Sequence, residues 1–494
     1  MPVVRARRTD FPPVLMSDSF DQLLATGLRF HREGRFEEAR DIYRQVLRDR
    51  PDHARAHHFL GLALRHRGQE AEAVGHFERA VAIEPSEPLY RATLADSYRV
   101  LGNIPAARAE LIVLSEQEVD EPDLRIQIGT QWGLLGETGR ALDYCRPVLE
   151  MFPDHARSNQ LLGTILHEQG KDADSIAPLE KARQSDTPVA DPTCALASAL
   201  LALGRYERLI GLGRPRDARQ MFGEGTLKSI ALWLTGRADE AKHFVEAARS
   251  HGERLGEWPQ KGAFTGMLDQ VGGLCEFRAA HGPSYASAAH ATLAVVGDEQ
   301  AVAAANFITT FGGRSTRLVG MPVFGCRALH VASEPNRFGD TFLAALDRLS
   351  PGDSFVSLLG SLDCRVSGLL AELPLDDQGR WTDLTPVAQL VDRFVDRLAA
   401  ESERRGLQPI LMGPPASNLQ VLVMKSLARD AYLTIIERFN AAMKAAARRH
   451  GLPFADLLAA TRGREGLGRA TLYINNNYVL PTAIAGALTD LERS

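Results

Sequence analysis

A short stretch beyond the middle of the chain combines a strand signal with two carboxylates. Apolar residues run from Leu293 to Val296 into Gly297, and Asp298 and Glu299 then open a run of helix formers. This order predicts a buried strand that turns sharply into a helix. Such a turn presents N–H groups and side chains at the carboxyl edge of a parallel sheet, where α/β folds place their ligands. The sequence therefore predicts a site that includes Gln300.

The acidic residues of this region allow two interpretations. Asp298, Glu299 and Asp363 could together bind a divalent cation or act as an acid/base pair. We prefer the alternative that Asp298 caps a helix and Glu299 lies at its positive end. Asp363 and Arg365 would then form hydrogen bonds that brace the pocket edge. Cys364 lies between them with no histidine nearby in the sequence, which favours a structural role over an activated thiol.

Length and composition exclude several classes of protein. The 494 residues suggest two or three domains, and 45% hydrophobic with 24% charged residues is typical of a soluble globular protein. The 57 Lys and Arg nearly balance the 62 Asp and Glu, which argues against nucleic-acid binding. Residues 1–19 lack the apolar core of a secretory signal, and the longest apolar run, Cys194–Leu203, is too short to span a membrane. Five scattered cysteines favour reduced thiols and a cytoplasmic location.

Small residues recur in the N-terminal half at a step of 34 residues. In this pattern the chain resembles the tetratricopeptide repeat family, in which a small residue marks a helix crossing and a large side chain fills the adjacent gap. The resemblance implies stacked helix pairs with a concave inner surface. We expect six to seven pairs, with an irregular one at residues 191–222. The glycines at the turns are Gly34, Gly68, Gly102, Gly136 and Gly170, and the gap-filling side chains are Tyr43, Phe77 and Leu111.

Strand and helix signals alternate beyond residue 290. Together they predict a three-layer α/β/α domain with a mostly parallel sheet. The predicted organisation is an N-terminal extension (1–19), an all-α repeat solenoid (20–250), a connector (251–290) with a helix from Gln260 to Ala280, and the α/β domain (291–494). The strands are expected at 293–296, 355–359, 409–412 and 453–458, and the helices at 336–349, 387–405 and 424–450.

Three segments of the α/β region, VVGDEQA, GSLDCR and LYINNNYVLP, resemble blocks of the SGNH/GDSL hydrolase superfamily, in particular bacterial proteins with a GEIDCR signature. The resemblance implies a flavodoxin-like sheet and a Ser, Asp and His triad. Here the three positions hold Glu299, Asn475 and Tyr478, so the resemblance implies a pocket that has lost hydrolysis. The pocket residues that it implies are Gly297, Asp298, Glu299, Gln300, Gly360, Asp363, Arg365, Asn475 and Tyr478.

The repeat resemblance also implies which residues line the groove. These residues predict a basic groove that docks a partner protein. The alternative is that they are solvated surface arginines with no binding role. The leading hypothesis is an interaction scaffold whose degenerate SGNH-like domain can bind a glycan or acyl ligand. The alternative is a carbohydrate O-acyl esterase or acyltransferase acting on a glycan or glycosylated protein that the repeats present. No cofactor, metal or membrane span is predicted. The implied groove residues are His31, Arg32, Arg55, His58, Arg65, His66 and Arg99.

Overall fold

The computed structural model describes most of the chain as two compact units, Met1–Leu162 and Gly163–Ser494. Arg365 and Asn475, two of the predicted pocket residues, lie outside the described residues. The described ranges are 14–185, 192–213, 217–256, 261–286, 288–333, 336–364, 383–416, 426–463, 472–474 and 478–493.

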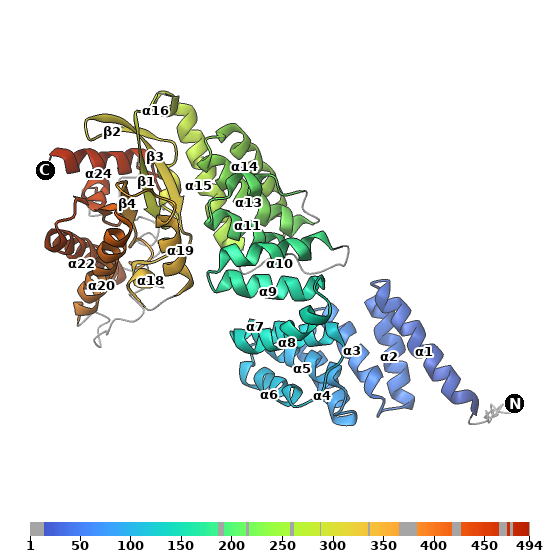
Figure 1. Cartoon of the computed structure of the whole chain (residues 1–494). Coiled ribbons are helices and arrows are strands. Elements are labelled where there is room, and N and C mark those ends of the chain that lie inside the picture. Colours follow the sequence, from blue (N-terminus) through green and yellow to red (C-terminus); the bar gives the residue numbers. More distant parts are fainter. Residues whose placement is uncertain are drawn as a thin grey trace. The chain divides into compact units, whose positions relative to one another are not determined.

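The first unit consists of antiparallel helix pairs (Figure 1). Each pair turns at a glycine of the 34-residue series, such as Gly68 with a φ of +75° and Gly102 with a φ of +76°, a backbone region that favours glycine. Proline in the first turn starts α5, α6 and α7, where its missing N–H costs no hydrogen bond. The helices are α1 (Val14–Arg32), α2 (Phe36–Asp49), α3 (Ala54–His66), α4 (Glu70–Ile83), α5 (Pro88–Val100), α6 (Ile104–Ser115), α7 (Pro122–Leu134) and α8 (Thr138–Met151).

Close crossings hold these pairs together, as the sequence predicts. A Cβ atom added to Gly61 would lie 2.5 Å from the ring of Phe77, which is fully buried. Tyr43 fills the equivalent gap beside Gly27. The first helices of successive repeats contact one another, α1 with α3 and α5 with α7, so they form the inner face of the solenoid.

The repeat pattern continues into the second unit. Counting α9 and α10, the described residues contain seven helix pairs, which confirms the upper figure of the predicted range. The sixth pair is irregular, because its second helix is a single turn. A long helix, α15, follows the pairs and confirms the predicted connector helix. These helices are α9 (Ala156–Glu168), α10 (Asp172–Gln184), α11 (Thr193–Ala202), α12 (Tyr206–Ile210), α13 (Ala218–Leu234), α14 (Ala238–Glu253) and α15 (Lys261–Ala280), followed by the short α16 (Pro283–Ala286).

The second unit also contains a six-stranded sheet in the order β2-β3-β1-β4-β5-β6. All neighbours are parallel except β2 and β3. The five parallel strands follow the doubly wound order in which the direction of winding reverses between β1 and β4. The strands are β1 (Ala291–Gly297), β2 (Ile308–Phe311), β3 (Arg314–Pro322), β4 (Ser354–Leu358), β5 (Gln408–Met412) and β6 (Phe454–Ala455), and a separate antiparallel pair is formed by β7 (Tyr473–Ile474) and β8 (Tyr478–Val479).

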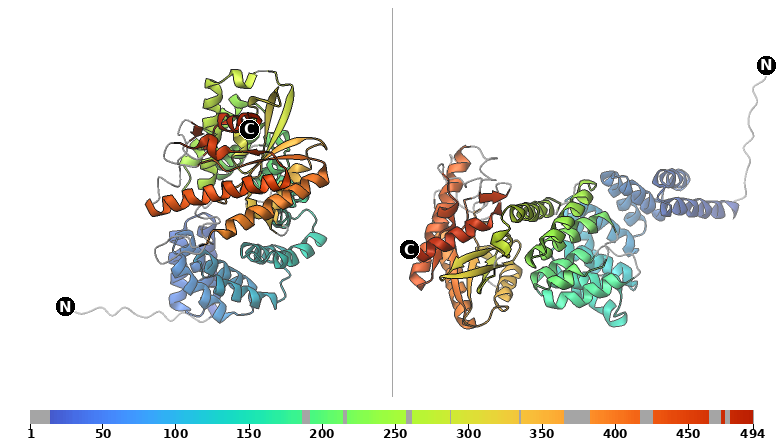
Figure 2. Two further views of the ribbon diagram at one scale, coloured as in Figure 1. Left: turned by 90° about the vertical axis from the view of Figure 1, so that its left-hand side faces the viewer. Right: turned by 90° about the horizontal axis from the view of Figure 1, so that it is seen from above.

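Helices cover both faces of the sheet. On one face lie α18 (Ala328–Ala332), α19 (Arg337–Leu346), α20 (Thr385–Arg405) and α22 (Ser426–His450), and Figure 2 shows α20 and α22 side by side. On the other lie α17 (Ala301–Ala304), α23 (Leu457–Thr461) and α24 (Pro481–Arg493). Each face of the sheet has its own hydrophobic core. Along β1, Ala294 and Val296 lie in the core beneath α19, α20 and α22, and Leu293 and Val295 lie in the core beneath α17 and α24, as strand alternation requires.

The core beneath α17 and α24 extends beyond the sheet. It continues through α17 and α24 into the repeat helices α10 to α14 and into α15. Trp233 of α13 is 1% exposed, and its Nε1–H donates to the carbonyl of Val302 at 2.9 Å. The side chain of Asn306 donates to the carbonyl of Trp233 at 2.9 Å. The boundary between the compact units therefore does not coincide with the border predicted near residue 250, because the later repeats and the sheet share one core.

The predicted strands and helices of the α/β region correspond to β1, β4, β5, β6, α19, α20 and α22. The antiparallel β2–β3 hairpin was not predicted. Its turn, Gly312-Gly313, has φ values of +61° and +67°, and a Gly-Gly pair between two segments that contain β-branched and aromatic residues is a hairpin signal that the sequence does contain.

Candidate functional site

The carboxyl ends of β1 and β4 meet at the point where the sheet reverses its winding. Gly297 ends β1 so close to β4 that an added Cβ atom would lie 1.9 Å from the carbonyl oxygen of Leu358. Only glycine fits there, and the turn after it places Asp298 beside the loop that follows β4. Gly360 in that loop has a φ of +112° and packs against the ring of Phe439. At both predicted pocket glycines, Gly297 and Gly360, a side chain would clash with its neighbours.

Asp298 is buried and receives two hydrogen bonds through its carboxylate. Oδ1 accepts from the backbone N–H of Gln300 at 3.0 Å, and Oδ2 accepts from the hydroxyl of Ser361 at 2.5 Å. The α17 helix begins at Ala301 with Gln300 as its N-cap residue, so Asp298 is not the cap that we expected. The carboxylate instead ties the turn after β1 to the loop after β4. Ser361 was not predicted as a site residue, and only its place directly after Gly360 could have indicated it.

Asp363 accepts hydrogen bonds, as we expected, and they come from backbone N–H groups. Its Oδ2 accepts from the N–H of Ala328 at 2.8 Å and its Oδ1 from the N–H of Leu329 at 3.1 Å, so it holds the first turn of α18. Burial raises the pKa of Asp363 above its usual value, while these N–H groups act in the opposite direction.

The three carboxylates lie around the thiol of Cys326. Burial raises the pKa of Cys326 well above its usual value, and the charges of Asp363, Asp298 and Glu299 raise it further. Cys364 is fully buried and burial also raises its pKa, which is the opposite of what activates a thiol and favours a structural role for Cys364. Within the described residues, no group of three or more His, Cys, Asp and Glu side chains has an arrangement that could hold a metal ion.

The last block of the chain approaches the same edge. The N–H of Val479 donates to Oε1 of Gln300 at 3.0 Å, which joins β8 to the turn after β1. The neighbouring Tyr478 points its hydroxyl toward α15, since an added Cβ atom at Gly266 would lie 2.9 Å from it. Gln270, also from α15, donates to the backbone carbonyl of Glu299 at 2.7 Å. Sequence reasoning missed Gln270, because nothing in the helix pattern separates it from other buried polar residues.

The predicted groove residues of the first unit differ in their surroundings. Arg32, Arg55 and His66 are exposed, and the Arg55 guanidinium lies 5.4 Å from the centre of the Phe59 ring. Arg65 and Arg99 both pair with Asp96, at 2.7 Å for Arg99, so one carboxylate offsets part of their charge. The face is less basic than the residue types suggest.

Two histidines assigned to this groove are not simple surface cations. The ring of His31 lies 5.3 Å from that of His66, and burial followed by the charge of His66 lowers the pKa of His31. His58 is 3% exposed and its Nε2 lies 3.1 Å from the hydroxyl of Thr93. Its assignment to the groove surface was wrong, because its position on α3 points into the core between repeats.

His58 makes the stability of the first unit depend on pH. Burial lowers its pKa from 6.5 to about 4, so the folded unit resists protonation while the unfolded chain accepts a proton below pH 6.5. Stability should therefore fall between pH 6.5 and 4, by roughly 3 kcal/mol in total from this residue. Urea titrations of His58→Asn should show a flatter dependence than the wild type, even though the variant is less stable at pH 7.

The pKa values of His57 and His76 are also lowered by burial, so some dependence on pH should persist in the variant. Equal slopes for wild type and variant between pH 6.5 and 4 would contradict the prediction.

The helix pairs, their 34-residue step and their glycine turns define the N-terminal region as a tetratricopeptide repeat region. Residues 24–88 match the family model of the tetratricopeptide repeat. Proteins of this type mediate protein–protein interactions or act as scaffolds. A search of curated protein sequences found no match. Within the described residues, no helix is both long and apolar enough to cross a membrane.

Several solved structures are similar to parts of the chain. A tetratricopeptide repeat protein from Parabacteroides merdae has 15% identity and a TM-score of 0.39, with 51% of this chain and 99% of that chain covered. PilF from Pseudomonas aeruginosa has 15% identity and a TM-score of 0.34, with 53% and 98% covered. A thermophilic repeat protein from Thermus thermophilus has 21% identity and a TM-score of 0.32, with 37% and 99% covered.

Proposed function

We propose that the protein is an interaction scaffold whose first unit docks a partner protein on the inner face of α1, α3, α5 and α7. The observation that carries this proposal is the combination of exposed cations and exposed apolar side chains on that unit. Arg32 and Arg55 supply positive charge, and Val100 is 51% exposed at the end of α5. A partner segment with acidic and apolar side chains suits such a face.

We further propose that the α/β region is an SGNH-like domain without hydrolytic activity. Its doubly wound strand order and the gathering of Asp298, Gln300 and Val479 at the sheet edge support this assignment. Glu299 stands where a nucleophilic serine would be needed. The edge can retain binding of a glycan or acyl ligand without cleaving it, in a protein that acts in the cytoplasm.

Partner binding should depend on the two exposed arginines and not on Arg65 and Arg99, which already pair with Asp96. Reversing both charges, Arg32→Glu with Arg55→Glu, should weaken binding by about tenfold, because each exposed charge contributes on the order of 0.7 kcal/mol. The measurement is the affinity for a partner first captured by the wild-type chain at low salt and then purified.

A matched control is Arg48→Glu, which reverses an exposed arginine on α2, a second helix of its pair. Its affinity should equal that of the wild type, and the wild-type affinity should fall as salt is raised. Loss of binding in the control alone would place the partner on the outer helices instead.

A further inference from the structure

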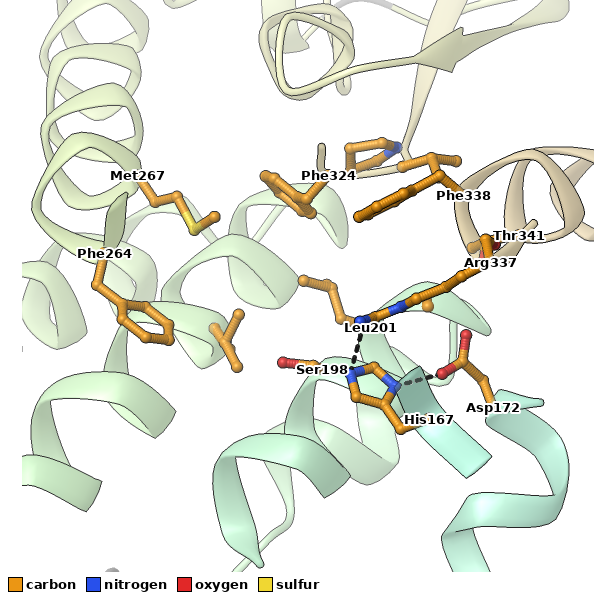
Figure 3. A pocket seen from close by; sticks show the side chains of 14 residues that line it. His167, Asp172, Ser198, Leu201, Phe264, Met267, Phe324, Arg337, Phe338 and Thr341 are labelled. Carbon is orange, nitrogen blue, oxygen red and sulfur yellow. Dashed lines mark hydrogen bonds and ion pairs between the residues drawn. The ribbon is translucent and has the colours of Figure 1, made fainter. Parts of the chain in front are cut away.

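A cavity of about 150 Å³ lies within the second unit, apart from the carboxylates around Cys326. Repeat helices α11 and α13 and the following helix α15 form one wall, and the segment after β3 with the start of α19 forms the other (Figure 3). Most of the lining is apolar and includes Leu201, Leu227, Phe264, Met267, Phe324 and Phe338. The cavity lies beside the carboxyl end of β3, which is the edge where α/β sheets bind ligands.

One end of this cavity is polar. Figure 3 shows Arg337 reaching from α19 toward His167, with Asp172 on the far side of the imidazole. Nη2 of Arg337 lies 2.8 Å from Nε2 of His167, and Nδ1 of His167 lies 2.5 Å from Oδ1 of Asp172. Because a guanidinium can only donate, Nε2 must accept and Nδ1 carries the proton. In this arrangement His167 lies between the Arg337 guanidinium and the Asp172 carboxylate.

The position of Arg337 is fixed by the backbone around it. A Cβ atom added to Gly170, in the turn after α9, would lie 3.0 Å from the Cα atom of Arg337, so the two backbones are in contact. The hydroxyl of Thr341 donates to the carbonyl of Arg337 at 2.8 Å. No carboxylate among the described residues forms an ion pair with its guanidinium. An apolar cavity thus ends at a cation that is held in place and that, within the described residues, contacts no carboxylate directly.

We propose that this cavity binds a small organic carboxylate, with the carboxylate on Arg337 and the apolar body among the phenylalanines and leucines. A cavity of this size in an apolar interior holds a molecule about as large as benzene, so the apolar body has about six to eight carbon atoms. The charge selects an anion, since a charge-assisted hydrogen bond from arginine to a carboxylate is among the stronger polar contacts. Such a ligand contacts both repeat helices and the α/β segment, and it stabilises the second unit by mass action.

Benzoate is a suitable probe, and benzamide is its uncharged counterpart of equal size. Titration of the full chain with each, followed by ligand-observed NMR and by thermal unfolding, should show saturable benzoate binding and an affinity for benzamide at least about tenfold lower. In Arg337→Met the benzoate affinity should fall by about 10-fold to 100-fold. The matched control is Arg348→Met, which removes an exposed arginine near the end of the same helix and should leave the affinity unchanged.

A second variant tests the cavity without touching the charge. Ala202→Leu adds three carbon atoms to the lining and should abolish benzoate binding while the chain still melts cooperatively. This variant also decides the matter if Arg337→Met fails to fold. The proposal is overturned if benzoate shows no saturable binding to the wild type, if benzamide binds equally well, or if Ala202→Leu binds benzoate as tightly as the wild type.

Discussion

The full chain should hydrolyse an activated acetyl ester such as p-nitrophenyl acetate no faster than the background rate in buffer. A serine hydrolase needs a hydroxyl nucleophile and a base that takes its proton near neutral pH. Glu299 is a poor acyl acceptor, because the mixed anhydride that it would form is unstable in water. Tyrosine has an ordinary pKa of about 10 and is a weak base at pH 7. Losing triad members costs several powers of ten in rate, which makes this the largest effect on activity that we expect.

The surroundings of Tyr478 strengthen this expectation. Its hydroxyl lies against α15 near Gly266. The contact between β8 and the turn after β1 is formed by the neighbouring Val479, whose N–H donates to Gln300. Glu299→Ser alone should therefore remain inactive. The triple variant Glu299→Ser, Asn475→Asp and Tyr478→His introduces the three residue types of the proposed triad and is the variant in which we expect turnover if the assignment is right.

Two comparisons would show that hydrolysis survives. Wild-type turnover well above background that disappears in Glu299→Ala would make Glu299 a catalytic residue and support the esterase alternative. Turnover that disappears in Ser361→Ala would instead assign the nucleophile to Ser361, whose hydroxyl already donates to the Asp298 carboxylate at 2.5 Å. Unaltered turnover in both variants would point to a contaminating hydrolase.

Replacing Trp233 by alanine should destabilise the second unit by about 3–5 kcal/mol, the range for removing a large aromatic side chain from a core. Trp233 is 1% exposed in the core that joins the repeat helices to the sheet, and the change also leaves the carbonyl of Val302 without its indole donor. Thermal unfolding of the full chain should show the transition of the second unit at a lower temperature. Trp233→Phe should lose less, because most of the buried ring area is kept.

The matched control is Trp132→Ala in α7, a tryptophan with 0% exposure in the first unit. It should shift the transition of the first unit and leave that of the second unchanged. If Trp233→Ala shifted both transitions equally, the two units would unfold as one and the division at Leu162 would not describe their stability.

Local patterns made the helix pairs predictable. The 34-residue step of glycines marks turns that depend on a few neighbouring residues, and the structure places Gly68 and Gly102 in the expected backbone region. Strand β1 was predictable for the same reason, since an apolar run into Gly297 is a local signal. The shared core was not, because a repeat helix has the same apolar pattern whether its outer side meets another repeat or a sheet. Trp233 and Val302 are 69 residues apart, and nothing in the sequence around either residue indicates that the two are in contact.

The sequence indicated which strand ends meet, but not which groups form hydrogen bonds with one another there. The turn after Gly297 and the loop at Gly360 do meet at the sheet edge, and Asp363 accepts hydrogen bonds from the first turn of α18. The hydrogen bond between Asp298 and Ser361 depends on how two strand ends align, which the residue types do not specify. The groove assignment of His58 was wrong because a family position gives the helix face only approximately, and a small rotation moves an imidazole from the surface into the core.

The core that runs from the repeat helices into the sheet also limits how such a chain can be recombined. A gene fusion that joined this α/β sheet to other repeats at residue 250 would leave the apolar side of α17 and α24 without the helices that now cover it. A segment that moved between proteins with this core intact would therefore have to include the helices from α10 onward.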